Sequence, residues 1–142
     1  MKNRLKDDFR NWALVCIDGV HFKLTEPSPF NPKWNLHKLG GAGVYYELVT
    51  CITTGDIVEF NGSFLACWSD SNIFRNKTKK QLLLGEKVLD DMGYKGDRKV
   101  ITSLNKRNKQ HSYAMGCTRD RHETINARMK TWGVLKLLFR YN

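Results

Sequence analysis

The sequence has few of the features that mark secreted, membrane-spanning or disulfide-stabilised proteins. Only four of its 142 residues are cysteine and no two are spaced as CxxC, so we expect neither a zinc site nor a disulfide framework. The longest apolar runs, such as residues 82–84, are far too short to cross a membrane. Residues 1–10 are charged and contain no apolar stretch, which argues against a secretory signal. We therefore expect a soluble, intracellular protein with no membrane partner.

Acidic residues are scarce in the C-terminal third of the chain. Residues 95–142 contain twelve Lys or Arg against three acids, a net charge of +9, whereas the whole chain carries +10. A block this basic is typical of a protein that binds a polyanion such as DNA. The alternative is an ordinary solvated basic surface. Hydrophobic residues make up 41% of the chain, which is enough for one globular domain of this length.

Proline is confined to one short segment. All three prolines lie within residues 27–32, which predicts a stiff loop rather than a strand. The segment that follows presents residues suited to gripping DNA by charge and by stacking: Lys33, Trp34, His37 and Lys38. The alternative interpretation is a stiff surface loop with Trp34 buried beneath it.

Short apolar runs predict β-strands, and two of these runs end in aspartate. Residues 12–17 (WALVCI) are typical of a strand buried on both faces, which we expect to end at Asp18. Residues 87–89 predict another short strand, ending at Asp90 and Asp91. Two further strands with a Thr-Gly-Asp turn predict a hairpin over residues 44–52 and 57–60.

Two helices are predicted. The first covers residues 71–84, with Ser69 and Asp70 suited to its N-cap and Gly85 directly after its end. The second covers residues 119–132. Its spacing predicts that Ile125, Met129 and Trp132 face the core, while another face carries Arg119, Glu123, Asn126 and Lys130.

Two strand-end acids and one helix acid are candidates for a shared metal site. Asp18 and Asp91 on neighbouring strands could converge with Glu123, and three carboxylates at one point repel each other unless cations lie between them. Oxygen ligands of this kind favour Mg²⁺ or Mn²⁺, and two such ions can support phosphodiester cleavage. Taken singly, each acid has an ordinary alternative, because aspartates are common in turns and a helix glutamate is usually solvated.

Five segments give the sequence a family resemblance. They are residues 17–21 (IDGVH), 26–38 (EPSPFNPKWNLHK), 68–76 (WSDSNIFRN), 82–97 (LLLGEKVLDDMGYKGD) and 121–135 (RHETINARMKTWGVL). On these segments the chain resembles the DDE-superfamily endonuclease domain of Harbinger-like and related eukaryotic transposases. The D-x-G-Y and R-H-E-x-x-N segments are the most specific. The resemblance covers residues 14–140, nearly the whole chain.

The resemblance implies an α/β fold of the RNase H type, a mixed sheet flanked by helices, and metal-dependent cutting and rejoining of DNA in the nucleus. By position, Asp18, Asp91 and Glu123 match the family's acidic triad. Asp70 is an alternative second acid, because W-S-D is also a family motif. We prefer Asp91, since it is predicted to follow a core strand, whereas Asp70 is better suited to a helix cap. On the Glu123 face, Arg119, Asn126 and Lys130 are expected to hold phosphate oxygens, and His122 is expected to point away.

The resemblance also sets out what the chain is expected to lack. We expect residues 1–142 to form a single catalytic domain without an N-terminal DNA-binding domain and truncated at its C-terminus. That leaves room for a homo-oligomer or a separate DNA-binding partner protein. Two other functions stay open: a domesticated, inactive transposase core that binds DNA or protein, and a nuclease acting on RNA–DNA hybrids. Retention of all three acids favours the enzyme over the binding module.

Overall fold

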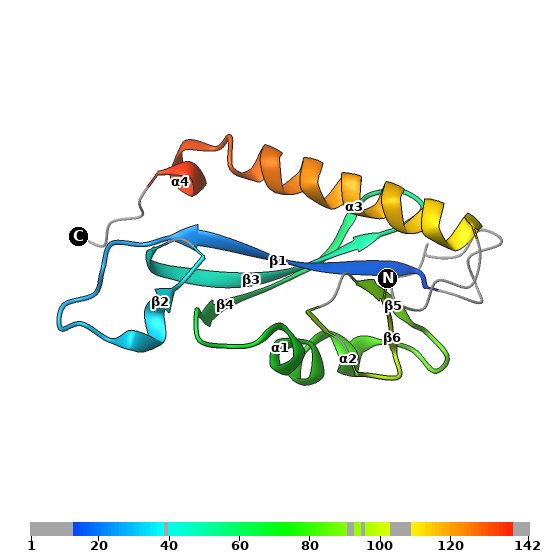
Figure 1. Ribbon diagram of the computed structural model, residues 1–142, viewed down its shortest axis with the longest axis horizontal. Coiled ribbons are helices and arrows are strands. Elements are labelled where there is room, and N and C mark those ends of the chain that lie inside the picture. The colour runs from blue at the N-terminus through cyan, green and yellow to red at the C-terminus, as the bar shows by residue number, and fades with distance from the viewer. Residues whose placement is uncertain (1–12, 39, 91–92, 95, 103–108, 138–142) are drawn as a thin grey trace.

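The sequence folds into a curved, mixed β-sheet with helices on both faces, as the sequence predicted (Figure 1). The computed structural model describes residues 13–38, 40–90, 93–94, 96–102 and 109–137. The strands are β1 (Val15–Lys23), β2 (Asn35–Leu36), β3 (Gly41–Cys51), β4 (Ile57–Leu65), β5 (Val88–Asp90) and β6 (Val100–Thr102). The helices are η2 (Pro32–Trp34), α1 (Asp70–Asn76), α2 (Thr78–Gln81), α3 (Lys109–Met129) and α4 (Gly133–Lys136). This arrangement is compatible with an RNase H-like fold.

The central strand is β1. The strand order is β2-β3-β1-β5-β6, with β4 also paired to β3. β1 runs antiparallel to β3 and parallel to β5, and β5 runs parallel to β6. The predicted adjacency of the two aspartate-bearing strands, β1 and β5, is therefore confirmed.

The predicted end of β1 at Asp18 is wrong. The strand continues to Lys23, because β3 pairs with it along its whole length, from Val15↔Cys51 to Lys23↔Gly43. Only the pairing with β5 ends early, at Cys16↔Leu89. Beyond that point one side of β1 is still hydrogen-bonded, so the strand needs no continuous apolar run to persist.

Alternate side chains of β1 point to opposite faces of the sheet, as strand geometry requires. Val15 and Ile17 pack with Phe74 of α1 in one core cluster. Val20 and Phe22 pack on the other face, against Met129 of α3. Figure 1 shows the same division, with α3 on one side of the sheet and α1 and α2 on the other. Asp18 belongs to the α3 face.

The predicted hairpin is confirmed as β3 and β4, with Gly55 in its turn at a φ of 77°. The predicted helix over residues 71–84 is divided and shorter. α1 starts after Ser69, whose side chain caps it by accepting from the Asn72 amide, and the helix breaks at Lys77. Directly after the break, the buried Thr78 hydroxyl donates to Glu47 of β3. The spacing of apolar residues does not reveal this polar contact, so the sequence analysis predicted one continuous helix.

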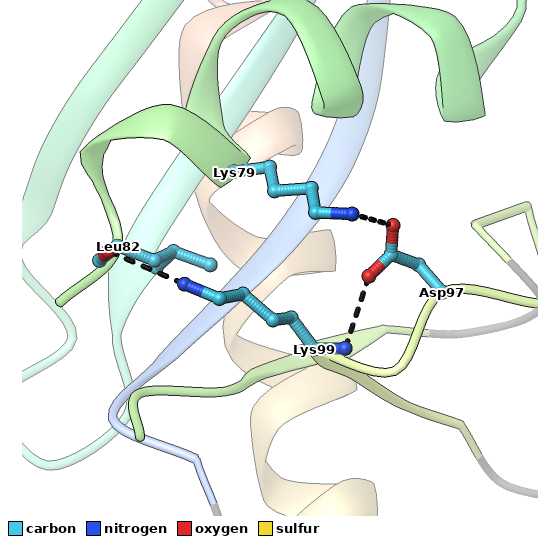
Figure 2. A network of polar contacts seen from close by, with 4 residues as sticks. All are labelled: Lys79, Leu82, Asp97 and Lys99. Atoms are coloured by element: carbon cyan, nitrogen blue, oxygen red, sulfur yellow. Dashed lines mark hydrogen bonds and ion pairs between the residues drawn. The ribbon is translucent and has the colours of Figure 1, made fainter. Parts of the chain in front are cut away.

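β6 was not predicted from the sequence, and a polar network holds the segment leading into it (Figure 2). Nζ of Lys79 in α2 lies 2.6 Å from Oδ2 of Asp97. The backbone N–H of Lys99 donates to Oδ1 of the same carboxylate at 3.0 Å. The Lys99 side chain donates in turn to the Leu82 carbonyl at 3.3 Å. These contacts fasten α2 to the connection between β5 and β6.

The C-terminal helix, α3, begins ten residues earlier than predicted and ends at Met129. Met129 packs on the sheet as expected, but Trp132 is 69% exposed, so its predicted place in the core is wrong. Trp132 lies beyond the end of the helix, where helical spacing no longer applies. No helix in the described part of the chain is long and apolar enough to cross a membrane.

Candidate active site

Asp18 lies in the middle of β1 with its side chain directed at α3. Its Oδ1 accepts a hydrogen bond from the Gly19 backbone at 2.8 Å, and its Oδ2 accepts one from Nδ2 of Asn126 at 3.0 Å. Oδ1 of Asn126 is buried and has no hydrogen-bond partner among the described residues. A carboxylate and a side-chain amide are thus brought together at the junction of the sheet and α3.

A buried polar cluster holds α3 against β1 beside this pair. Nε2 of His122 lies 2.8 Å from Oγ1 of Thr50 and 2.6 Å from Sγ of Cys16. Burial lowers the pKa of His122, and burial raises the pKa of the Cys16 thiol to about 12. The imidazole and the thiol are therefore both uncharged at neutral pH. His122 lies one turn before Asn126, so the cluster also fixes where Asn126 meets Asp18.

Glu123 lies on the exposed side of α3. Its side chain is 72% exposed, and its Oε1 lies 3.7 Å from Nε of Arg119. The expected grouping of Arg119 and Glu123 on one helix face is confirmed. Asn126 lies between the face that carries Glu123 and the sheet, and its side-chain amide donates a hydrogen bond to Asp18. His122, expected to point away from Glu123, is buried against the sheet.

Asp91 lies outside the described residues. The strand before it, β5, ends at Asp90, whose Oδ2 accepts from the Tyr94 backbone at 3.1 Å. The last parallel pair between β1 and β5 is Cys16↔Leu89. In the sequence, Asp18 and Asp91 each follow that pair by two residues.

Asp70 is the first residue of α1, on the face of the sheet opposite to α3. Its carboxylate lies against Gly93, and its charge adds to burial in raising the pKa of Tyr45. Tyr45 pairs with His21 of β1, a position that alternates with Asp18 and faces the other way. The structure therefore brings Asp18 together with Asn126 and places Asp70 on the opposite face.

Basic residues lie near His21, three residues after Asp18 on β1. The pKa of His21 is lowered, first by burial and next by the charge of Lys38, with a further contribution from Lys130. Lys38 follows β2, and Lys130 follows α3. Both are exposed, as are Lys33, His37 and Arg119. Trp34 is half-buried and packs against the Val20 cluster, in line with the expected alternative for that loop.

The described residues alone form no metal site. Among them, no group of three His, Cys, Asp or Glu side chains lies close enough together to hold an ion. The Asp18 carboxylate is the kind of oxygen ligand that Mg²⁺ and Mn²⁺ prefer, while Asn126 turns its amide nitrogen toward it. The chemistry of Asp18 fits a hard divalent cation, and further carboxylates would have to complete the set.

A comparison with protein families matches residues 17–142 to a family described as DDE superfamily endonuclease. The chain belongs to this family. Membership indicates a transposase-like nuclease that acts on DNA with divalent metal ions. The matched region of this DDE endonuclease includes Asp18, Asp91 and Glu123. Comparisons with curated proteins and with solved structures give no match.

Two contacts of this DDE endonuclease were missed by the sequence analysis: Asn126 with Asp18, and His122 with Cys16. The signal for both is the spacing of α3 itself. The residues of the helix that lie against the sheet are Met115, Thr118, His122, Asn126 and Met129. These positions recur at helical spacing, but three of the five are polar, so a search for apolar periodicity does not find them.

Proposed function

We propose that this chain is the catalytic core of a metal-dependent DNA endonuclease or transposase, with Asp18, Asp91 and Glu123 as its carboxylates. One observation carries the proposal: in a DDE superfamily endonuclease, Asp18 is held by Asn126 on the same helix that bears Glu123. The likeness to Harbinger-type transposases, and with it action in the nucleus, belongs to this proposal.

The arrangement of strands favours Asp91 over Asp70 as the second acid. Asp18 and Asp91 follow the same parallel pair of β1 and β5 at equal distance in the sequence. Asp70 belongs to α1, on the far face of the sheet from the Asp18 carboxylate. A metal shared with Asp18 would therefore have to reach through the sheet to meet Asp70.

Asp18, Asp91 and Glu123 would hold Mg²⁺ or Mn²⁺, with two ions proposed. When bound, such ions activate a water molecule and stabilise the leaving oxygen in phosphodiester cleavage. The chain's own residues orient the acids. The Gly19 N–H and the Asn126 amide fix the two oxygens of Asp18, and the His122 cluster fixes α3. A carboxylate whose hydrogen bonds are satisfied stays in one rotamer, which a metal site requires.

DNA would meet the protein along the exposed basic residues near this site. The proposed contacts are Lys33, Trp34, His37, Lys38, Arg119 and Lys130, with Asn126 at the inner edge. Lys38 and Lys130 support contact with DNA near β1, because the charge of each lowers the pKa of His21, three residues after Asp18. Their charges would hold phosphates without reading sequence.

The second candidate is a domesticated core that binds DNA or protein without cutting. It is favoured by the exposed basic residues near β1, which would hold DNA whether or not the acids bind metal. Nicking of supercoiled plasmid in Mn²⁺ separates the two functions. We expect nicking by the wild type and by the matched control Glu26→Gln, and none by Asp18→Asn, Asp91→Asn or Glu123→Gln. DNA binding without any nicking by the wild type would establish the binding module instead.

A further inference from the structure

Two glycines that follow the proposed metal ligands are packed too closely to carry a side chain. Gly19 follows Asp18 directly, and a Cβ there would lie well inside 3.0 Å of the Tyr45 hydroxyl. Gly93 lies two residues after Asp91, and a Cβ there would collide with Oδ2 of Asp70. Each of the two segments therefore packs against a polar side chain at its glycine: Gly19 against Tyr45, and Gly93 against Asp70.

Tyr45 also contacts the segment that follows Gly93. Its hydroxyl lies 3.0 Å from the hydroxyl of Tyr94, the residue directly after Gly93. Tyr45 is 1% exposed, and its ring meets His21 edge-on at 4.6 Å. The pair of Tyr45 and Tyr94 therefore joins the support beneath Gly19 to the segment at Gly93.

The first turn of α1 fastens the second segment further. Ser71 donates through Oγ to the Gly93 carbonyl at 3.1 Å. Phe74, one turn along the helix, packs edge-on against Tyr94 at 5.9 Å. Tyr94 is 3% exposed, and its N–H is held by Asp90. Since Ser69 caps α1, the start of the helix has a fixed position from which to hold Gly93.

We propose that Tyr45 and Asp70 are positioning residues that set the separation of the segments carrying Asp18 and Asp91. They act from the face of the sheet opposite to the Asp18 carboxylate. Asp70 contributes as a side chain of fixed size against Gly93 and binds no metal. This role rests on the proposed function, because it concerns residues that would hold the ions.

Mn²⁺ affinity of the full chain, measured by electron paramagnetic resonance, tests this role. Asp70→Asn keeps the size of the side chain, so it should retain wild-type affinity and an unchanged spectrum of the bound ion. Asp70→Leu and Tyr45→Phe should each weaken Mn²⁺ binding about tenfold, the loss typical of residues that orient metal ligands. Circular dichroism confirms that each variant is folded. Loss of binding in Asp70→Asn would make Asp70 a ligand and overturn the proposal.

A double-mutant cycle tests the contact with Gly93. Gly93→Ala alone should weaken Mn²⁺ binding, because the new methyl group meets the Asp70 carboxylate. In an Asp70→Ala background that collision is absent, so Gly93→Ala should add little. Gly116→Ala, where a Cβ meets nothing, is the matched control. Equal penalties in both backgrounds would overturn the proposal.

The outcomes also separate this role from the proposed function. Mn²⁺ binding that is insensitive to Asp70→Leu and Tyr45→Phe would overturn only the positioning role. A wild-type chain that binds no Mn²⁺ would overturn the proposed function together with it.

Discussion

Nδ2 of Asn126 lies 3.0 Å from Oδ2 of Asp18, joining the C-terminal helix to the central strand across 108 positions of sequence. The same helix carries Glu123 one turn earlier. The contact therefore fixes the rotation of α3 relative to β1, and with it the exposed side of the helix on which Glu123 lies.

Replacing Asn126 with leucine tests this relationship. The variant keeps the branched shape of the side chain but loses the donor to Asp18, so the carboxylate is no longer held toward α3. We expect the nicking rate at saturating DNA to fall about tenfold. Thr124→Ala is the matched control, because Thr124 is exposed on the same helix and donates only to the Asp120 carbonyl. An unchanged nicking rate in Asn126→Leu would show that the contact has no part in positioning Asp18.

The buried contact of His122 with Thr50 predicts a stability effect. His122→Leu leaves the Thr50 hydroxyl with fewer partners in a buried site, which typically costs about 1–3 kcal/mol. Thr50→Val in addition removes the stranded hydroxyl, so the double variant should be less destabilised than the sum of the single ones. Urea unfolding measures all three free energies. Additive losses would mean that the two side chains do not interact.

Glu47 predicts a pH dependence of stability. It is fully buried, and burial raises its pKa above the ordinary 4.5, although hydrogen bonds from Thr78 and Asn61 oppose the shift. The native state therefore holds this proton more tightly than the unfolded state. Its contribution to stability is complete below pH 4.5 and is lost as the pH rises through the raised pKa.

Glu47→Gln removes this titration. The stability of the variant relative to wild type should therefore increase between pH 4 and pH 7, as measured by thermal unfolding in matched buffers. Glu59→Gln, on the adjacent strand β4, provides the control for loss of a carboxylate. A constant difference between wild type and Glu47→Gln over this range would contradict the raised pKa.

The exposed basic residues predict salt-sensitive DNA binding without sequence preference. Arg119→Ala with Lys130→Ala should weaken binding about equally for unrelated duplexes and flatten the dependence on salt, because fewer phosphates are neutralised. Lys80→Ala is the control, since α2 lies on the opposite face of the sheet. Fluorescence anisotropy over a salt series measures both effects. A DNA affinity that does not change with salt would contradict the proposed contacts with phosphates.

The sequence predicted those parts of the fold that apolar patterns encode. The cores of β1, β3 and β5, and the hairpin between β3 and β4, follow from runs of apolar residues and a Gly-containing turn. Its errors lie where polar contacts decide the structure. β1 extends past Asp18 through pairing with β3, and the helix after Ser69 breaks beside the buried Thr78 and Glu47.

In the candidate site, too, motifs could be read from the sequence, whereas the polar contacts between distant residues could not. The acids and their order stay predictions from motifs, and the structure confirms the parallel pairing of the strands that precede Asp18 and Asp91. The contacts that orient Asp18 were not predictable. Asn126 and His122 are polar residues on the sheet-facing side of α3, and Tyr45 meets Tyr94 only because distant segments fold together.

The most direct measurement of the central claim is anomalous diffraction from crystals of the chain soaked in Mn²⁺. We expect anomalous density within about 2.3 Å of a carboxylate oxygen of Asp18, at a ligand distance normal for a hard divalent cation. Asp91 and Glu123 should complete its shell, and Asp70 should lie on the other face of the sheet without metal. Density bound by Asp70 instead of Asp91, or none beside Asp18, would contradict the account.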